Sequence, residues 1–507
     1  MERLLIDGNH LTIEDVVRTA REQIQVAMTV EAAQRVQESR NVVDDFVEEE
    51  RVVYGITTGF GKFSDVLISK EEAVQLQRNL IISHACGVGE PLPEEIVRGV
   101  MLLRANALSK GYSGVRLETI QVLLDMLNKK VHPVIPEKGS LGASGDLAPL
   151  AHMVLVMMGE GEAFYEGRRI PGGEAMEKAG IAPVVLTSKE GLGLINGTQV
   201  MTAVGALCVA DAMTLIKTLD IAGALTLEAL RGITDAFDPR VHQLRPHAGQ
   251  IRSAANILKI TEGSDRTTRQ LDIRVQDAYT LRCIPQIHGA SWDAILFVKE
   301  KVEIELNGVT DNPLIFASEK DAISGGNFHG QPVALAFDFL GIALSEIANV
   351  SERRIERMVN PQLSGLPAFL TKKGGLHSGL MIAQYSAASL VSENKILAHP
   401  ASVDSIPSSA NQEDHVSMGT IGARKARSIL TNAQYVVGIE LMAACQAMDL
   451  GEDRKMGRGT KAAYDTLRRK LPMLTDDRIL YPDLETMADL VRSGELVKAV
   501  ENNVEAL

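Results

Sequence analysis

Long apolar segments without helix-breaking residues dominate the second half of the chain. Between Pro332 and Pro361 there is no further proline and only one glycine, so this run predicts a helix of about 40 Å at 1.5 Å rise per residue. Proline is tolerated in a first helical turn, and Pro361 would end the helix. The same pattern predicts further helices at 201–231, which Gly232 would cap, and at 292–307, 380–399 and 415–450.

These segments are apolar around much of their circumference, which predicts burial on several sides, either inside a bundle or at a subunit interface. Residues 120–127 and 484–491 follow the period of surface helices, and residues 161–172 form the one convincing β-hairpin signal. The fold class predicted is mainly all-α. A loop-rich, minor-β N-terminal domain (residues 1–200) would precede a long-helix bundle domain (residues 201–507), and the irregular stretch 232–282 is long enough to suggest a functional role.

Composition narrows the possible partners and the cellular setting. The 507 residues contain 52 Lys and Arg against 65 Asp and Glu, a net charge of −13, which argues against nucleic acid and anionic membranes as partners. The longest uninterrupted apolar runs, such as 153–158, are far short of the roughly 20 residues that span a bilayer. The first residues do not resemble a signal peptide. Four widely spaced cysteines fit a reducing compartment, so a cytoplasmic protein is predicted.

Familiar cofactor motifs fail in this sequence. The segment 59–63 has Phe63 where a phosphate loop needs Ser or Thr, and 191–196 has Asn196 where a dinucleotide fingerprint needs its third glycine. The eleven histidines form no HExxH motif and no tight cluster of metal ligands. No nucleotide, pyridoxal phosphate or metal is therefore expected.

One glycine-rich loop, residues 139–150, offers unusual chemistry. Taken alone, Ala143-Ser144-Gly145 is a weak motif, because such a run is most often only a tight loop. Gly145 has no side chain, however, so its nitrogen could approach the carbonyl carbon of Ala143 in a strained bend. Attack with loss of water would close a five-membered ring, and dehydration of Ser144 would leave an exocyclic methylidene. The chain itself would then supply an electrophile.

Residues 143–149 (ASGDLAP) resemble the prosthetic-group signature of the aromatic amino acid ammonia-lyases, which form 4-methylidene-imidazol-5-one (MIO) from this tripeptide. Other blocks of that family resemble this chain in order and character over residues 54–415. These blocks are 54–61 (YGITTGFG), Ser83-His84, 196–199 (NGTQ), 276–282 (QDAYTLR), 310–313 (TDNP), 326–330 (GNFHG) and 411–415 (NQEDH). Together they make a specific signal.

The resemblance implies a helical architecture like that of the fumarase/aspartase lyases and a homotetramer whose active sites are shared between subunits. It also implies an MIO electrophile that works by covalent catalysis. Each residue that it implicates has an ordinary alternative, such as a packed loop tyrosine, a turn asparagine or a surface arginine. The catalytic residues that it implies are Tyr54 as the base, Tyr279, and Ala143, Ser144 and Gly145 as the MIO precursor; the substrate-binding residues are Asn196, Gln276, Arg282 (for the carboxylate) and Phe328.

Substrate choice depends on two further residues. An imidazole ring differs from a phenyl ring by its nitrogens, so a histidine pocket needs polar partners, and His84 and Glu413 are the candidates. Family members that act on phenylalanine usually have apolar residues at the position of His84. L-Histidine, converted to trans-urocanate and ammonia, is therefore the expected substrate. The alternatives are another MIO enzyme (a tyrosine or phenylalanine ammonia-lyase or an aminomutase), a fumarase-type lyase, or an inactive helical scaffold.

Overall fold

The computed structural model describes residues 3–59, 68–69 and 72–507, so Phe60 and Gly61 of the 54–61 block lie outside the described residues. The chain divides into two compact units. Unit 1 comprises Met1–Ala210, Lys299–Asp338 and Pro400–Arg424, and unit 2 comprises Asp211–Val298, Phe339–His399 and Lys425–Leu507. The prediction of domains at 1–200 and 201–507 stays a prediction.

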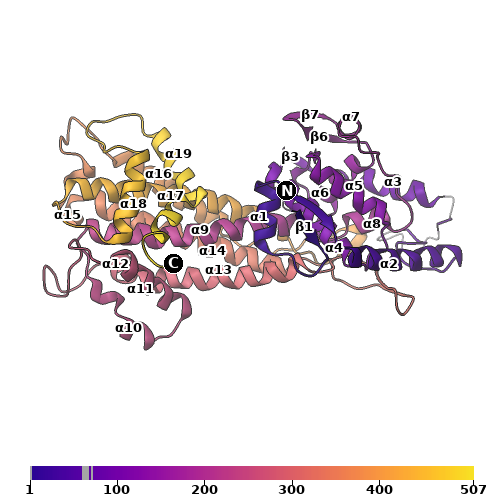
Figure 1. The fold of residues 1–507 in the computed structure, drawn as a ribbon, viewed down its shortest axis with the longest axis horizontal. Helices are drawn as coiled ribbons and strands as arrows, with labels where there is room; N and C mark the ends of the chain where they lie inside the picture. Colours follow the sequence, from indigo (N-terminus) through magenta and orange to yellow (C-terminus); the bar gives the residue numbers. More distant parts are fainter. Residues whose placement is uncertain (1–2, 60–67, 70–71) are drawn as a thin grey trace. The chain divides into compact units, whose positions relative to one another are not determined.

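Unit 1 combines helices with small sheets (Figure 1). Its helices are α1 (Ile13–Arg21), α2 (Val30–Glu48), α3 (Ala73–His84), α4 (Glu94–Ser109), α5 (Leu117–Asn128), α6 (Leu147–Met157), α7 (Gly172–Lys178) and α8 (Glu190–Ile195), with a 3₁₀ turn at Ser409–Asn411. Its strands are β1 (Arg3–Ile6), β2 (Gln25–Met28), β3 (Val88–Pro91), β4 (His132–Pro133), β5 (Pro136–Lys138), β6 (Glu162–Tyr165), β7 (Arg168–Pro171), β8 (Leu314–Phe316) and β9 (Asp321–Ile323). Strands β1 and β2 pair in parallel, and the pairs β3–β5, β4–β6, β6–β7 and β8–β9 are antiparallel.

Helix α4 lies at the centre of unit 1, because every residue from Ile96 to Ser109 is buried. It carries a buried arginine, Arg98, which donates from Nε to the Thr19 carbonyl of α1 (2.8 Å) and from Nη1 to the Leu127 carbonyl of α5 (3.0 Å). Carbonyls in the last turn of a helix have no partner within that helix. The arginine therefore satisfies acceptors at the ends of two neighbouring helices inside the core.

Unit 2 is almost entirely helical. Its shorter elements are the 3₁₀ turns Thr234–Phe237 and Ala368–Leu370 and the helices α10 (Pro239–Gln243), α11 (Ala248–Ile260), α12 (Tyr279–Arg282), α15 (Pro361–Ser364), α16 (Met381–Leu397), α18 (Arg458–Lys470), α19 (Tyr481–Ser493) and α20 (Glu495–Glu501). The long helices α9 (Gln199–Ala229), α13 (Ile284–Leu306), α14 (Gln331–Val359) and α17 (Gly419–Leu450) contain four of the five chain boundaries between the units. Within unit 2 these four helices lie alongside one another and share buried side-chain hydrogen bonds (Figure 1).

The predicted helices at 332–360, 201–231 and 380–399 are confirmed as α14, α9 and α16, and the hairpin at 161–172 as β6 and β7. Helix α13 begins eight residues earlier than predicted. It includes Gly289, where a Cβ atom would lie 2.3 Å from the Gln250 nitrogen, so a close approach explains this glycine. The long-helix, mainly α fold class is confirmed.

Other sequence predictions need correction. Gly232 does not take the left-handed conformation that ends α9; Arg231 does, at φ +51°. Gly232 instead donates its N–H to the Leu227 carbonyl (2.7 Å), and Arg231 donates to the Glu228 carbonyl (3.2 Å), which is the Schellman pattern. The segment 232–282 is less irregular than predicted, since it contains α10, α11 and α12.

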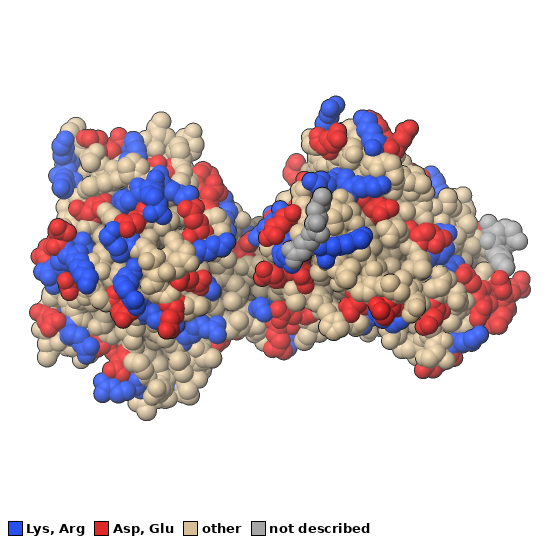
Figure 2. All heavy atoms as spheres, viewed as in Figure 1, with Lys and Arg blue, Asp and Glu red and all other residues tan. Residues whose placement is uncertain are grey.

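Two helices are long and apolar enough to cross a membrane by length and composition, contrary to the sequence-based expectation. They are α9 and α14, and 78% and 67% of their most apolar windows are buried within the protein. Core helices pass the same test, so burial explains this apolarity. Figure 2 shows acidic and basic side chains interspersed over the face in view.

Candidate active site

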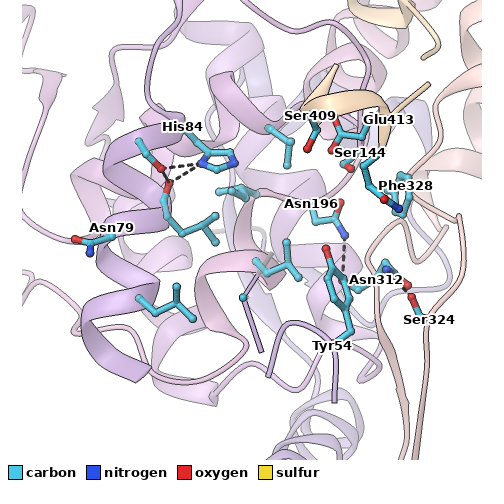
Figure 3. Close-up of a pocket in the computed structure, with 18 of the residues that line it drawn as sticks. Tyr54, Asn79, His84, Ser144, Asn196, Asn312, Ser324, Phe328, Ser409 and Glu413 are labelled. Atoms are coloured by element: carbon cyan, nitrogen blue, oxygen red, sulfur yellow. Dashed lines mark hydrogen bonds between the residues drawn. The ribbon is translucent and has the colours of Figure 1, made fainter. Parts of the chain in front are cut away.

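A cavity of about 940 Å³ in unit 1 brings six predicted site residues together (Figure 3). These six residues are Tyr54, His84, Ser144, Asn196, Phe328 and Glu413. They come from separate parts of the chain, and the cavity's remaining lining is partly apolar, with Leu76, Leu80, Leu147, Leu192 and Ile195 among its walls. A mostly apolar cavity with a few convergent polar groups is the usual form of a small-molecule site.

The loop at Ser144 is tightly bent. Gly142, Ser144 and Gly145 have φ values of +78°, +53° and +77°, and a bridge joins Gly142 to Gly145. The left-handed conformation costs a non-glycine residue roughly 1–2 kcal/mol, so the loop holds Ser144 in strain. At Gly145 a Cβ atom would lie 2.2 Å from the Gly197 oxygen. Only glycine fits there, and this arrangement suits the formation of MIO from residues 143–145.

Asp146 anchors this loop. Its backbone N–H donates to the Gly197 carbonyl (2.7 Å), and its buried carboxylate accepts from Val200 N and Met201 N (2.9 Å each) at the start of α9. The hydroxyls of Ser140 (2.9 Å) and Thr420 also donate to it. Burial raises the pKa of Asp146, and these hydrogen bonds oppose the rise. The loop is thereby fixed to the N-terminus of a long helix, where a carboxylate is favoured by the helix dipole.

Tyr54 lies on a turn that is stabilised by hydrogen bonds of two threonine side chains. The Thr57 hydroxyl accepts from Val53 N (2.9 Å) and donates to the Arg51 carbonyl (2.7 Å), and the Thr58 hydroxyl accepts from Gly55 N (3.1 Å). Gly55 has φ +68°, which glycine adopts at little cost. These side-chain hydrogen bonds fix a backbone segment that belongs to no helix or strand. They thereby position the half-buried tyrosine at the cavity.

His84 is the last residue of α3 and lies at one side of the cavity. Its Nδ1 lies 2.8 Å from the Leu80 carbonyl, which can only accept, so Nδ1 carries the proton. Burial lowers the pKa of His84, against the raising effects of that hydrogen bond and of the Glu413 carboxylate. The neutral ring therefore has Nε2 as a hydrogen-bond acceptor.

Glu413 is held by its own loop. Its Oε2 accepts from the Ser408 hydroxyl (3.0 Å), and the backbones of the two residues exchange hydrogen bonds of 3.0 and 3.3 Å. Nearby, the rings of His329 and His415 stack with centroids 5.6 Å apart. Because His329 directly follows Phe328 and His415 lies two residues after Glu413, their stacking joins two distant blocks at the cavity.

Asn196 follows α8 and is supported by a buried polar cluster. Its Nδ2 donates to Asp311 Oδ1 (3.3 Å) and to the Asn312 carbonyl (3.2 Å), and Lys189 Nζ lies 2.5 Å from Asp311 Oδ2. Arg104 donates to the backbone carbonyl of Asn196 (2.9 Å). Burial lowers the pKa of Arg104 to about 10 and also lowers the pKa of Lys189.

The other five predicted site residues do not line this cavity, although Ala143 and Gly145 flank Ser144, which does. Gln276, Tyr279 and Arg282 belong to unit 2. Tyr279 and Arg282 share one face of α12, with the guanidinium carbon 4.7 Å from the ring centroid. The side chain of Tyr279 is 69% exposed.

Several lining residues were not predicted from the sequence. Asn312 belongs to a block that resembled the family, and its side chain accepts from Gly325 N (2.6 Å) and donates to Ser324 (3.2 Å). Ser409 and Gln412 shortly precede Glu413, so proximity in sequence was the available signal. Lys189 and Asp311 support Asn196 without lining the cavity. Nothing in the sequence pairs them, because 121 residues separate their positions in the chain.

The strained Ser144 loop, Tyr54 and a mostly apolar cavity with a few polar groups match the site expected of an amino acid lyase, and the comparison with known families agrees. Residues 11–469 match the aromatic amino acid lyase family. The chain belongs to this family.

The chain is also similar to individual proteins over its full length. The chain is 69% identical over 505 residues, covering 100% of both proteins, to the histidine ammonia-lyase of Alkaliphilus oremlandii. The crystal structure of histidine ammonia-lyase from Trypanosoma cruzi superimposes with a TM-score of 0.93 at 42% identity, over 99% of this chain and 96% of that one. Tyrosine aminomutase from Streptomyces globisporus has a TM-score of 0.96 at 39% identity, over 100% of both chains. The architecture is therefore common to lyases and aminomutases, and substrate choice depends on the cavity.

Proposed function

We propose that this protein eliminates ammonia from L-histidine to give trans-urocanate. The observation that carries the proposal is that a neutral His84 and the Glu413 carboxylate both line the cavity that Ser144 lines. His84 Nε2 and Glu413 both accept hydrogen bonds, which suits the one N–H of a neutral imidazole ring and the two N–H groups of a protonated one. A phenyl ring would leave these polar groups without partners, at a cost in binding. The similarity to histidine ammonia-lyases supports the same substrate.

MIO, formed from Ala143, Ser144 and Gly145, would supply the electrophile of the reaction. The residues fit it, because Gly145 contacts Gly197 too closely for any side chain and Asp146 fixes the loop to α9. Tyr54, at the same cavity, is assigned the removal of the substrate β-proton through its phenolic oxygen. Asn196 and Phe328 line the space around the reacting atoms. No metal, nucleotide or pyridoxal phosphate is needed in this scheme.

The remaining predicted residues, which belong to unit 2, are assigned to a second subunit. In the proposed homotetramer, Gln276, Tyr279 and Arg282 from another copy complete the site, and Arg282 binds the substrate carboxylate in a bidentate fork. Two observations support assembly. Tyr279 is largely exposed, and α16 exposes Ile382, Tyr385 and Ile396 on its surface. Exposed apolar residues on one helix are typical of protein interfaces. A cytoplasmic location fits the acidic charge and unpaired cysteines.

The test is a substrate panel with purified protein. We expect L-histidine to yield a product with the ultraviolet absorbance of urocanate, together with one ammonia per product molecule. L-Tyrosine and L-phenylalanine serve as comparison substrates, with chromatography for β-amino acids. Turnover of tyrosine or phenylalanine in preference to histidine would replace this proposal with a related lyase or an aminomutase.

A further inference from the structure

The side-chain oxygen of Asn196 is a buried acceptor whose partner is not accounted for. Asn196 is only 3% exposed, and its Oδ1 has no hydrogen-bond partner among the described residues. Both amide hydrogens are used on the other side, by Asp311 and Asn312. In Figure 3 the amide nitrogen is directed to Asn312 and the oxygen lies on the side of Ser144. A buried polar atom without a partner is costly, so this oxygen suits a ligand donor.

The neighbours of Asn196 determine which end of the amide faces the cavity. Turning the amide over would place its oxygen against Asp311 Oδ1 and the Asn312 carbonyl, two groups that can only accept. Asp311 accepts from Lys189 Nζ (2.5 Å) and from the Asn312 N–H (2.7 Å). Both charged side chains are almost fully buried, at 0% and 1% exposure. The ion pair therefore fixes the amide through a charge that cannot donate.

The backbone around Asn196 is also fixed by hydrogen bonds, like its side-chain amide. Lys189 immediately precedes α8 and Asn196 immediately follows it, so the same short helix carries the cation and the amide. Arg104 binds the carbonyls of Gly193 (2.5 Å) and Asn196 (2.9 Å) at the end of that helix. Contacts within the protein therefore set both the position and the rotation of the Asn196 side chain before the substrate binds.

An acceptor oxygen restricts the substrate group that it can bind. An ionised carboxylate also only accepts, so it is excluded as a partner. The imidazole ring of the substrate has acceptors in His84 and Glu413, which both line the cavity. The remaining donor of an amino acid is its α-amino group.

We propose that Lys189 and Asp311 are positioning residues that hold the Asn196 amide oxygen toward the cavity, where it accepts a hydrogen bond from the substrate α-amino group. This inference rests on the proposed function and deepens it. It places the amine, rather than the carboxylate, beside Asn196.

The experiment compares two ligands that each lack one group. Histamine has the ring and the amine but no carboxylate, and 3-(imidazol-4-yl)propanoate has the ring and the carboxylate but no amine. In the Asp311→Asn protein the Asn196 amide faces a side chain that can donate as well as accept, so its orientation is no longer fixed. We expect the Kd of histamine to rise about 10- to 100-fold, the loss typical of a hydrogen bond to a charged group, while the Kd of the propanoate changes less than about threefold.

Two further variants complete the design. Asp321→Asn removes an exposed carboxylate that pairs with Arg51 away from the cavity, and it should leave both affinities unchanged. If Asp311→Asn fails to fold because Lys189 loses its partner, Asn196→Leu decides the question, since leucine has a similar volume and no acceptor. It should weaken histamine binding selectively.

Four results would overturn the inference: equal weakening of both ligands, selective weakening of the propanoate, unchanged binding of both ligands, or failure of the wild type to bind histamine. Histidine turnover by the wild type is measured in parallel. If the wild type forms urocanate but the ligands do not discriminate as expected, only this inference fails. If it forms none, the proposed function fails first.

Discussion

Two buried polar clusters, one in each unit, use similar side chains for different purposes. The site cluster of unit 1 consists of Arg104, Lys189, Asn196 and Asp311. The bundle cluster of unit 2 consists of Asp220, His288, Arg354 and Glu440, all fully buried. In the site cluster, Asn196 Oδ1 and Arg104 Nε have no hydrogen-bond partner among the described residues. In the bundle cluster every side-chain nitrogen and oxygen has one.

The bundle cluster forms a continuous chain of hydrogen bonds. Asp220 accepts from Ser253, Asn256, Trp292 and His288 Nδ1 (2.7 Å). His288 Nε2 then lies 3.0 Å from Arg354 Nη1, and Arg354 forms a two-point contact with Glu440 (2.5 and 3.0 Å). Because Nε2 accepts from an arginine that can only donate, the ring is neutral and its tautomer is fixed.

Buried charged groups that stabilise the fold differ from those that serve a site in whether all their hydrogen bonds are made within the protein. In the bundle cluster every side-chain nitrogen and oxygen has a partner within the protein, so none remains to bind a ligand. The role of this network is to specify how α9, α13, α14 and α17 pack. The site cluster leaves an acceptor toward a cavity and stands beside a loop with a strained Ser144. Unsatisfied atoms and strain persist where a ligand or a reaction needs them.

The largest effect is expected at the strained loop. Ser144→Ala cannot form MIO, so turnover should fall about 10³-fold or more, with no loss of thermal stability. Intact mass provides a second readout. The wild type should fall short of its sequence mass by two water molecules, whereas the variant should not. Ser318→Ala, at an exposed position, is the control. Near wild-type turnover in Ser144→Ala would remove this loop from the chemistry.

The bundle cluster should respond in the opposite way. Arg354→Met leaves Glu440 buried without its counter-charge, which typically costs about 3–5 kcal/mol. Chemical denaturation should show the lower free energy of unfolding, while folded protein at low denaturant keeps the two-water mass deficit. A variant as stable as the wild type would mean that the cluster is not structural.

Glu413→Gln tests the ring end of the cavity. The change keeps the shape of the side chain and its contact with Ser408, so stability should not change. The value of kcat/KM for histidine should fall about 10- to 100-fold, as for the loss of a hydrogen bond to a charged group. Glu319→Gln, exposed on the turn between β8 and β9, should have no effect. An unaltered kcat/KM in Glu413→Gln would exclude this residue from substrate binding.

The smallest effect concerns pH. Burial, together with the Arg354 guanidinium, lowers the pKa of His288 below 6.5 against the opposing influence of Asp220. The folded state therefore binds fewer protons than the unfolded state, so this stabilisation is present above pH 6.5 and is lost as pH falls toward the lowered pKa. The slope from one group is at most about 1.4 kcal/mol per pH unit.

His288→Gln removes that component of the pH dependence. The difference in free energy of unfolding between wild type and variant should be constant above about pH 7 and should shrink at lower pH. A difference that stays constant through this range would show that His288 does not titrate in folding.

Part of the fold was predictable because it depends on local patterns. The unbroken apolar runs predicted α9, α14 and α16 within two residues at each end. The start of α17 was misjudged by four residues, since Met418 adopts φ +54° and donates its N–H to Leu141 in the Ser144 loop. The first part of α13 was missed for a similar reason. It contains Gly289, and the contact that explains this glycine is with Gln250 of another helix, α11.

The sequence by itself determined the helical class, the family blocks and the residue types of the chemistry, because periodicity and motif spacing are properties of the chain alone. Tertiary structure decided which of those residues meet. It placed His84 and Glu413, more than 300 residues apart in the chain, at one cavity, packed Gly145 against Gly197, and directed one end of the Asn196 amide toward that cavity. Such contacts depend on close packing and hydrogen-bond geometry between distant segments, which no local pattern encodes.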